Sequence, residues 1–467
     1  MCNDTLTAPS LGMNDFLAAF DLDRANIKMI DIYHEDGTLI IYLELNAQIH
    51  TCPVCQSPTD KVKGYHLKKI KHSILNPVPC IIHYRARRYV CPVCGKTFYE
   101  HNPISFQGLK ISAATVYNVL QELKRPEATF TYVAHKYNIS PSSVSNIFDN
   151  YIHIPRRVLP ECISFDETYA FKSDDSDYIM VLLDYTNKKI IDVLPSRRKR
   201  YLSDYFFKIP IDEREKVKYC SYDMWETYRS ISKLMFPNSV GIVDKFHILA
   251  DFSKRVHSVR INVMKNNKLV YDAFHLKKKE LEKQNQKLSP EEYEKYTEAY
   301  KNYYLLKKFN FLLFSNNPEY TNPNREKKYN KVLGRYCNFY DLYEMLLSID
   351  SLLKEAVEIR DDLHRFYSQC TYENAKNELE SFIITCRSSR IRNIQDFANT
   401  LVNWKNEIIN SFIIIPTINR KMNNGLIENR NKSIKLLKHS SNGYTNWSRF
   451  RNRVLYTLND DIPIKIK

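Results

Sequence analysis

The sequence contains no uninterrupted apolar run that approaches the roughly 20 residues a helix needs to cross a bilayer. The longest apolar stretches, such as residues 412–416, have the length of core segments. The first residues also lack a basic segment followed by an apolar one, so we expect no secretion signal. These absences exclude a membrane-spanning protein and indicate a cytoplasmic one without a membrane partner.

Acidic residues are scarce relative to basic ones: 53 against 69, which gives a formal net charge of +16. Such a balance favours a polyanionic partner, most simply nucleic acid, over a small-molecule substrate. At 467 residues the chain is too long for one ordinary core, so two to four domains are expected. Eleven cysteines, an odd number, fit a reducing compartment in which some thiols bind metal and the others stay free.

Four of the cysteines form two identical CPVC motifs, Cys52 with Cys55 and Cys91 with Cys94, separated by 35 residues. Each motif turns the backbone so that two thiolates face one ion, and two such turns complete a tetrahedral site. We therefore predict a structural zinc site in a zinc ribbon at residues 51–105. Because the four thiolates fill the coordination shell, no zinc catalysis is expected.

The stretch between the two cysteine pairs is basic, with no acid from Lys61 to Arg88. Tyrosines and histidines are interleaved with its cations, a pattern typical of nucleic-acid binding, although a solvated charged face is the alternative. Such cations would contact DNA phosphates without reading the base sequence. The candidate contacts are Lys68, Lys69, Arg85, Arg87 and Arg88.

Residues 110–152 show the pattern of a three-helix helix-turn-helix domain. An amphipathic segment ends before Pro126, and two short apolar faces then flank a tight turn at Asn138. Ser140 is a good N-cap and Pro141 a good first-turn residue for the last helix. This helix would present Ser142, Ser143 and Asn146 to DNA, whereas a plain helical hairpin is the alternative.

Acidic residues end several predicted strands in residues 160–250. Asp166 lies in an apolar strand that a two-stranded meander follows, and Asp223 ends a later strand. Neighbouring parallel strands bring such carboxylates within reach of one cation. The pattern suggests a ribonuclease H-like α/β sheet, with Asp184 as the substitute if Asp166 or Glu428 is misassigned. Asp244 and His247 follow a further short strand.

The next segment, residues 251–419, has a helical pattern throughout and is expected to be an all-helical insertion. Residues 420–460 would supply the helices that complete the catalytic domain. If a helix begins near Gly425, then Glu428, Asn431 and Lys435 share one face. That face would lie on DNA with the carboxylate turned toward metal, although a surface Glu–Lys pair is the commoner use of such spacing.

The order of these motifs resembles the ISL-three family of bacterial insertion-sequence transposases. The resemblance rests on the paired CPVC motifs, SFDET, SYDMW, VDKFH and the block NGLIENRNKSIKLLK with GYTNWSRFRNRV, and it covers nearly the whole chain. It implies a catalytic triad of Asp166, Asp223 and Glu428 that holds Mg²⁺ or Mn²⁺. It also implies supporting roles for Asp244 and His247; a purely local role, in shaping the turn from strand to helix, is the alternative.

The resemblance implies a DDE transposase that binds the ends of an insertion sequence and cleaves and joins DNA strands. Two alternatives stay open: a DNA-binding regulator with an inert catalytic domain, and a metal-dependent nuclease without strand transfer. We expect double-stranded DNA as the partner, a homodimer or larger assembly on it, and a place at the bacterial nucleoid. The expected fold is multidomain α+β, and its first part, residues 1–50, would be a helix and a hairpin.

Overall fold

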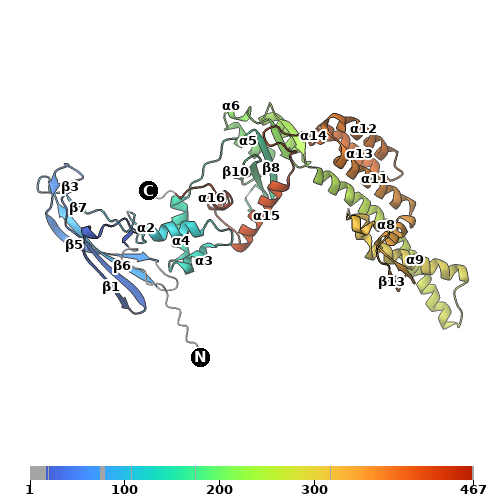
Figure 1. The fold of residues 1–467 in the computed structure, drawn as a ribbon, viewed down its shortest axis with the longest axis horizontal. Helices are drawn as coiled ribbons and strands as arrows, with labels where there is room; N and C mark the ends of the chain where they lie inside the picture. The colour runs from blue at the N-terminus through green and yellow to red at the C-terminus, as the bar shows by residue number, and fades with distance from the viewer. Residues whose placement is uncertain are drawn as a thin grey trace.

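The computed structural model describes residues 17–18, 20–73, 79–106, 108–173, 175–315 and 317–464. The helix expected near residues 14–20 falls largely outside these ranges. The molecule is elongated: an N-terminal sheet lies at one end, a small helical unit and a second sheet follow, and a long helical region forms the other end (Figure 1).

The N-terminal sheet contains five strands in the order β1-β2-β6-β5, with β7 paired to β6. The expected hairpin of β1 and β2 turns at Asp36 and Gly37, whose positive φ angles of 45° and 73° suit a tight turn. The hairpin shares one sheet with the strands between the cysteine pairs, because β2 pairs in parallel with β6. The strands are β1 (Ile27–Glu35), β2 (Thr38–Leu45), β5 (Val62–His72), β6 (Cys80–Val90) and β7 (Thr97–Tyr99), with a separate short pair β3 (His50–Thr51) and β4 (Pro58–Thr59).

Three helices follow the sheet, α2 (Ala113–Glu122), α3 (Phe130–Lys136) and α4 (Pro141–Tyr151). Each begins as the sequence indicates, because the side chains of Ser112, Thr129 and Ser140 accept a hydrogen bond from the first turn. The three helices share a core that includes buried valines and Phe148. The predicted cap at Ser140 and the first-turn Pro141 of α4 are found, and α2 ends at Glu122, ahead of Pro126.

The second sheet contains β8 (Cys162–Thr168), β9 (Ile179–Asp184), β10 (Lys189–Leu194), β11 (Tyr219–Tyr222) and β12 (Val240–Val243). Its order is β10-β9-β8-β11-β12. The first three strands form the predicted antiparallel meander, and β11 and β12 add in parallel to β8. The two parallel connections each carry helices, as such crossovers require.

Helices cover both faces of this sheet (Figure 1). One face packs through Phe165, Leu182 and Tyr222 against the helices between β10 and β11 and after β11. The other face packs through Val181 and Val193 against the two C-terminal helices. The covering helices are α5 (Lys199–Phe207), α6 (Ile211–Arg214), α7 (Glu226–Met235), α15 (Gly425–Ser440) and α16 (Trp447–Leu458).

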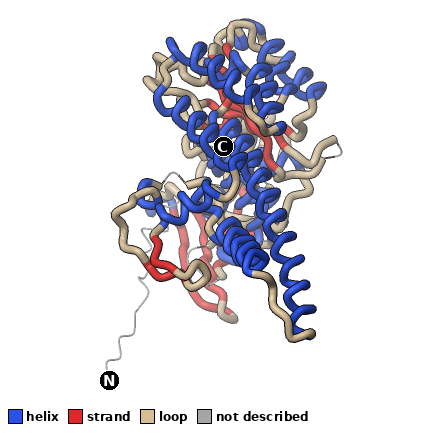
Figure 2. The backbone as a smooth tube through the Cα atoms, turned by 90° about the vertical axis from the view of Figure 1, so that its right-hand side faces the viewer, coloured by secondary structure: helices blue, strands red, loops and turns tan. Residues whose placement is uncertain are grey.

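The region after β12 is mostly helical, and Figure 2 shows its long helices projecting from the rest of the tube. The prediction of an all-helical insertion is wrong in one detail, because β13 (Lys328–Asn330) and β14 (Arg335–Cys337) form a hairpin with Gly334 at φ 69°. Helix α14, the last of this region, lies against the edge strand β12, where Asn410 Nδ2 donates to the Gly241 carbonyl at 2.9 Å. The helices are α8 (Lys245–Lys283), α9 (Pro290–Lys308), α10 (Phe339–Ser348), α11 (Ser351–Gln369), α12 (Tyr372–Ser388), α13 (Arg392–Asn403) and α14 (Lys405–Asn410).

Helix α16 joins the second sheet to the α2–α4 unit. Arg449 forms a two-pronged ion pair with Asp149 of α4, the shortest contact being 2.6 Å. Arg453, only 1% exposed, donates to the carbonyls of Arg125 and Ala128 at 3.0 and 2.7 Å. A buried guanidinium is tolerated only with such acceptors. The interface between α16 and the α2–α4 unit therefore depends on these two carbonyls.

Candidate functional site

The two CPVC motifs form matching turns at one end of the N-terminal sheet. In each, the amide after the second cysteine donates to the first cysteine's carbonyl at 3.0 Å, from Gln56 in one turn and Gly95 in the other. Both residues have positive φ angles, 61° and 72°. The turns therefore present their thiols in the same way.

The four cysteine sulfurs converge, and all lie within 4.8 Å of one another. The Cys55 and Cys91 sulfurs are 3.4 Å apart, and those of Cys52 and Cys94 are 3.6 Å apart. A tetrahedral zinc with Zn–S bonds of about 2.3 Å would separate its sulfurs by roughly 3.8 Å. The donor set and its spacing fit one zinc ion.

The second cluster consists of carboxylates at the ends of three parallel strands. Ser221 of β11 pairs with Ser164 of β8, and Tyr222 pairs with Val243 of β12. Continuing this register places Asp223 beside Asp166 on one side and beside Asp244 on the other. Three aspartates thus stand at one level across neighbouring strands, which a twisted parallel sheet brings close together.

Asp166 is 8% exposed and its carboxylate is surrounded by other acids. Burial, reinforced by the charge of Asp223, raises the pKa of Asp166 to about 8. Its Oδ2 accepts a hydrogen bond from Asn431 Nδ2 at 2.8 Å, and its Oδ1 accepts one from the Glu167 amide at 2.7 Å. A buried carboxylate of this kind is stabilised in its charged form by a bound cation.

Asn424, which is fully buried, connects two of the aspartates. Its Nδ2 donates to Asp223 Oδ1 at 2.7 Å, and its backbone amide donates to Asp244 Oδ2 at 2.9 Å. Ser221 Oγ donates to Asn424 Oδ1 at 2.6 Å and so fixes which way the amide points. Nothing in the sequence marks this asparagine apart from its place directly before α15, which suggests a capping role.

Glu428, in the first turn of α15, lies with Asp244 and His247, and the ligand atoms of the three are within 4.8 Å of one another. His247 Nε2 contacts Asp223 Oδ1 at 2.7 Å, which links this group to the other aspartates. Burial lowers the pKa of His247, but its hydrogen bond to Asp223 and the nearby carboxylates outweigh burial and raise it. The structure therefore brings all five predicted catalytic and supporting residues to one edge of the sheet.

Asp244 has both carboxylate oxygens committed to backbone amides. Oδ1 accepts from Phe246 at 3.1 Å and caps α8, and Oδ2 accepts from Asn424. With 1% exposure, this aspartate shapes the turn from β12 to α8, as the local alternative predicted. Asp184 lies at the other end of the meander and both its oxygens accept from Asn187, so it does not belong to the cluster.

Two of the residues predicted to contact DNA are buried, so these two predictions are wrong. Arg87 is 2% exposed, and its guanidinium pairs with Glu44 at 3.1 Å and with Glu100 at 3.3 Å. Asn431 is 6% exposed and lies on the buried side of α15, where it contacts Asp166. A DNA backbone cannot reach either side chain, because neighbouring strands or the sheet cover them.

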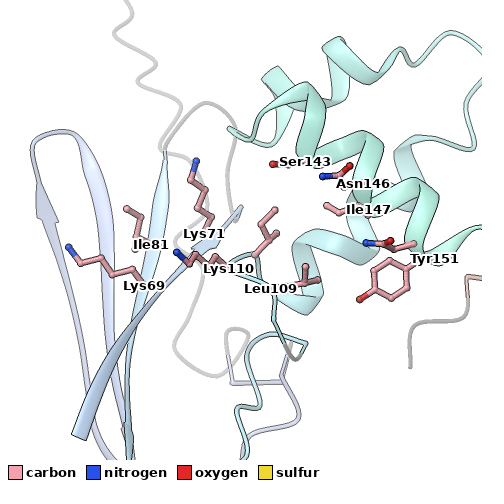
Figure 3. Close-up of a pocket in the computed structure, with 11 residues that line it drawn as sticks. Lys69, Lys71, Ile81, Leu109, Lys110, Ser143, Asn146, Ile147 and Tyr151 are labelled. Atoms are coloured by element: carbon pink, nitrogen blue, oxygen red, sulfur yellow. The ribbon is translucent and has the colours of Figure 1, made fainter. Parts of the chain in front are cut away.

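The other predicted DNA contacts have at least part of their surface open to solvent. Figure 3 shows Lys69 on the sheet side of a cavity and Ser143 and Asn146 on α4 opposite. Arg85 stacks over the Tyr65 ring at 4.1 Å and also pairs with Glu44 at 3.0 Å. The exposed or half-buried set is Lys68, Lys69, Arg85, Arg88, Ser142, Ser143, Asn146 and Lys435.

The acidic cluster fits a divalent cation by its donors. Asp166, Asp223 and Glu428 offer hard carboxylate oxygens, which Mg²⁺ and Mn²⁺ prefer. Burial, together with the nearby charge of Asp223, raises the pKa of Asp166, and a bound cation would offset both effects. Among the described residues of this cluster, His247 is the only basic one. Of the three acids, it lies at hydrogen-bond distance only from Asp223.

The chain belongs to the ISL3 family of DDE transposases. The family model for this domain, described as a transposase, matches residues 163–454, which is more than half of the 467 residues. A second family model, the zinc finger of transposases IS204, IS1001, IS1096 and IS1165, matches residues 48–94. The N-terminal cysteine site is therefore the zinc ribbon of these transposases, and the resemblance found in the sequence is confirmed.

The chain is similar to the transposase for insertion sequence element IS1001 of Bordetella parapertussis. The two are 20% identical over 237 residues, which cover 50% of this chain and 58% of that relative. In the part of the chain that the structure describes, we find no helix with the length and apolarity to span a bilayer.

We predict that Asn424→Ala weakens the response to divalent metal and leaves DNA binding unchanged. Losing the amide frees Asp223 to rotate, and loss of a group that orients a metal ligand typically costs about 10–100-fold in metal affinity. The measurement is the Mg²⁺ concentration for half-maximal DNA cleavage. Asn429→Ala, an exposed change on the same helix, is the control. Equal metal dependence of Asn424→Ala and wild type would show that Asn424 does not orient the acid.

Proposed function

We propose that this protein is a DDE transposase that binds the ends of an insertion sequence and performs metal-dependent DNA cleavage and strand transfer. The observation that carries the proposal is the placement of Asp166 and Asp223 on neighbouring strands, with Glu428 beside Asp244 and His247, at one end of a sheet that has helices on both faces. We interpret this sheet as a ribonuclease H-like fold interrupted by the helical region. Family membership supports the same activity.

In this proposal Asp166, Asp223 and Glu428 hold two divalent cations, Mg²⁺ or Mn²⁺. The cations supply activation of an attacking water or DNA 3′-hydroxyl and stabilisation of the leaving oxygen during in-line displacement at phosphorus. Asn424 holds Asp223 by its amide, and Asn431 does the same for Asp166. His247 Nε2 donates to Asp223 Oδ1 and helps to hold that carboxylate in place. No side chain needs to form a covalent bond with DNA.

We further propose that the α2–α4 unit is a helix-turn-helix whose last helix reads the element end. The exposed polar residues of α4 and the short turn at Asn138, with φ 52°, support this interpretation. The zinc ribbon adds phosphate contacts. Two element ends must be held together for strand transfer, so we expect at least a dimer on double-stranded DNA, at the nucleoid of a bacterial cell.

The competing proposal is a DNA-binding regulator with an inert catalytic domain. The test uses the full-length protein, Mg²⁺ and an end-labelled duplex that carries the sequences flanking the gene. A transposase nicks this duplex at fixed positions, whereas a regulator protects it without cutting. Binding without cleavage, in Mg²⁺ and in Mn²⁺, would replace the proposed function with the regulator.

A further inference from the structure

A groove of about 390 Å³ lies between the N-terminal sheet and helix α4 (Figure 3). Three lysines contribute to it from the sheet side, Lys69 and Lys71 from β5 and Lys110 from the segment that leads to α2. All three are exposed, and none forms an ion pair within the described residues. None of the described residues that line the groove is acidic.

The opposite wall consists of polar side chains on one face of α4. Ser143, Asn146 and Asn150 recur at intervals of three and four residues and line the groove together. The lining also includes apolar side chains, among them Ile81, Leu109 and Ile147. A DNA strand has matching chemistry, because its sugars are largely apolar and its phosphates accept charge-assisted hydrogen bonds.

The sheet and the helices on either side of this groove are fastened to each other. The Lys71 amide donates to the Lys110 carbonyl at 2.9 Å, and the Ser112 amide donates to the Lys71 carbonyl at 2.9 Å. Ser112 Oγ, which caps α2, lies 2.7 Å from His72 Nδ1. Ser73 adds a bond from its amide to Thr115 Oγ1 at 2.9 Å. These bonds hold β5 to the start of α2, and α2 shares one hydrophobic core with α4, so the spacing between β5 and α4 is fixed before DNA arrives.

We propose that the sheet and α4 form one composite binding surface for a single DNA duplex, and that the groove between them holds one strand of its sugar–phosphate backbone. Lys71 and Lys110 contact the phosphates while α4 lies in the adjacent major groove. The proposal rests on the proposed function. It adds that the sheet and α4 act as one surface, whereas two separately mobile domains would contact DNA with variable spacing. Here the spacing between the phosphate contacts and the base contacts is constant.

The test is a Lys71→Gln/Lys110→Gln double variant of the full-length protein, bound to the duplex that carries the flanking sequences. The matched control is Lys295→Gln/Lys301→Gln, which removes the same charge from exposed positions on α9. The slope of log affinity against log salt should fall in magnitude by about 2 for the groove variant, about 1 for each lysine, and stay unchanged for the control. Zinc content and circular dichroism check that both variants fold.

A second measurement locates the contact. Neutral methylphosphonate linkages are placed one at a time along each strand of the duplex. Wild type should lose affinity at a short run of phosphates beside the bases that α4 protects, and the groove variant should be insensitive there. If wild type binds and cuts but the groove variant behaves as the control does, the groove proposal fails while the proposed function stands. If wild type neither binds nor cuts the duplex, both fail.

Discussion

The Asp223→Asn variant is expected to lose DNA cleavage by at least about a thousand-fold, or roughly 4 kcal/mol of transition-state stabilisation. Asp223 stands between Asp166 and Asp244 at the strand ends and accepts from both Asn424 and His247. The amide that replaces it removes one negative ligand and presents an NH₂ group to these two donors. The measurement is the single-turnover cleavage rate of a labelled duplex in saturating Mg²⁺.

DNA affinity of this variant and its salt dependence should match wild type, because the substitution leaves the N-terminal sheet and α4 untouched. Asp204→Asn is the matched control, since this aspartate is exposed on α5 and does not belong to the acidic cluster. It should cut at the wild-type rate. Cleavage by Asp223→Asn within tenfold of wild type would exclude Asp223 as a metal ligand.

The second large effect is expected from loss of the zinc site. Cys91→Ser should reduce bound zinc from one ion per chain to nearly none, because a hydroxyl is a poor substitute for a thiolate ligand. Binding of structural zinc is worth about 10–16 kcal/mol in small zinc domains, so the turns at residues 52–56 and 91–95 should open. Zinc analysis by mass spectrometry and amide hydrogen exchange of these turns are the measurements.

Cys337→Ala provides the control for this experiment, since Cys337 lies in the β13–β14 hairpin and does not belong to the sulfur cluster. Its zinc content should equal that of wild type. The rest of the N-terminal sheet has its own core, including Ile41, Leu43 and Ile82, which should limit the opening to the zinc end. Stoichiometric zinc in Cys91→Ser would contradict a four-cysteine site.

Features fixed by short-range rules could be predicted from the sequence. The two CPVC turns, the cap of α4 at Ser140 and the meander after Asp166 all depend on residues within a few positions. The proximity of Asp166 and Asp223 could also be predicted, because the ends of neighbouring parallel strands lie side by side at one end of a sheet. In each case local propensity and tertiary structure favour the same conformation.

Predictions that depended on distant partners failed. Arg87 was assigned to DNA because no acid lies between Lys61 and Arg88, yet its partners Glu44 and Glu100 lie outside that stretch. Asn431 was assigned to the face of Glu428 by its spacing of three residues. It lies equally four residues after Ile427, and packing of α15 on the sheet places it on the buried face.

The role of Asn424 could not be predicted from the sequence either, because its partners are also distant in the chain. Its side-chain partners, Ser221 and Asp223, are 203 and 201 residues away in the chain. The helical region separates them, and no local pattern indicates that its two ends return to one sheet. The β13–β14 hairpin was missed because its strands have only three residues each.

The measurement that tests the central claim most directly is product analysis of a reaction with the full-length protein, Mg²⁺, a duplex with the flanking sequences and a supercoiled target. We predict cuts at fixed ends that leave 3′-hydroxyls, followed by joining of these strands to the target, and neither step with Asp166→Asn. Cutting without joining would indicate a nuclease. Joining by Asp166→Asn, or no cutting by wild type in Mg²⁺ or Mn²⁺, would contradict a transposase that uses this acidic cluster.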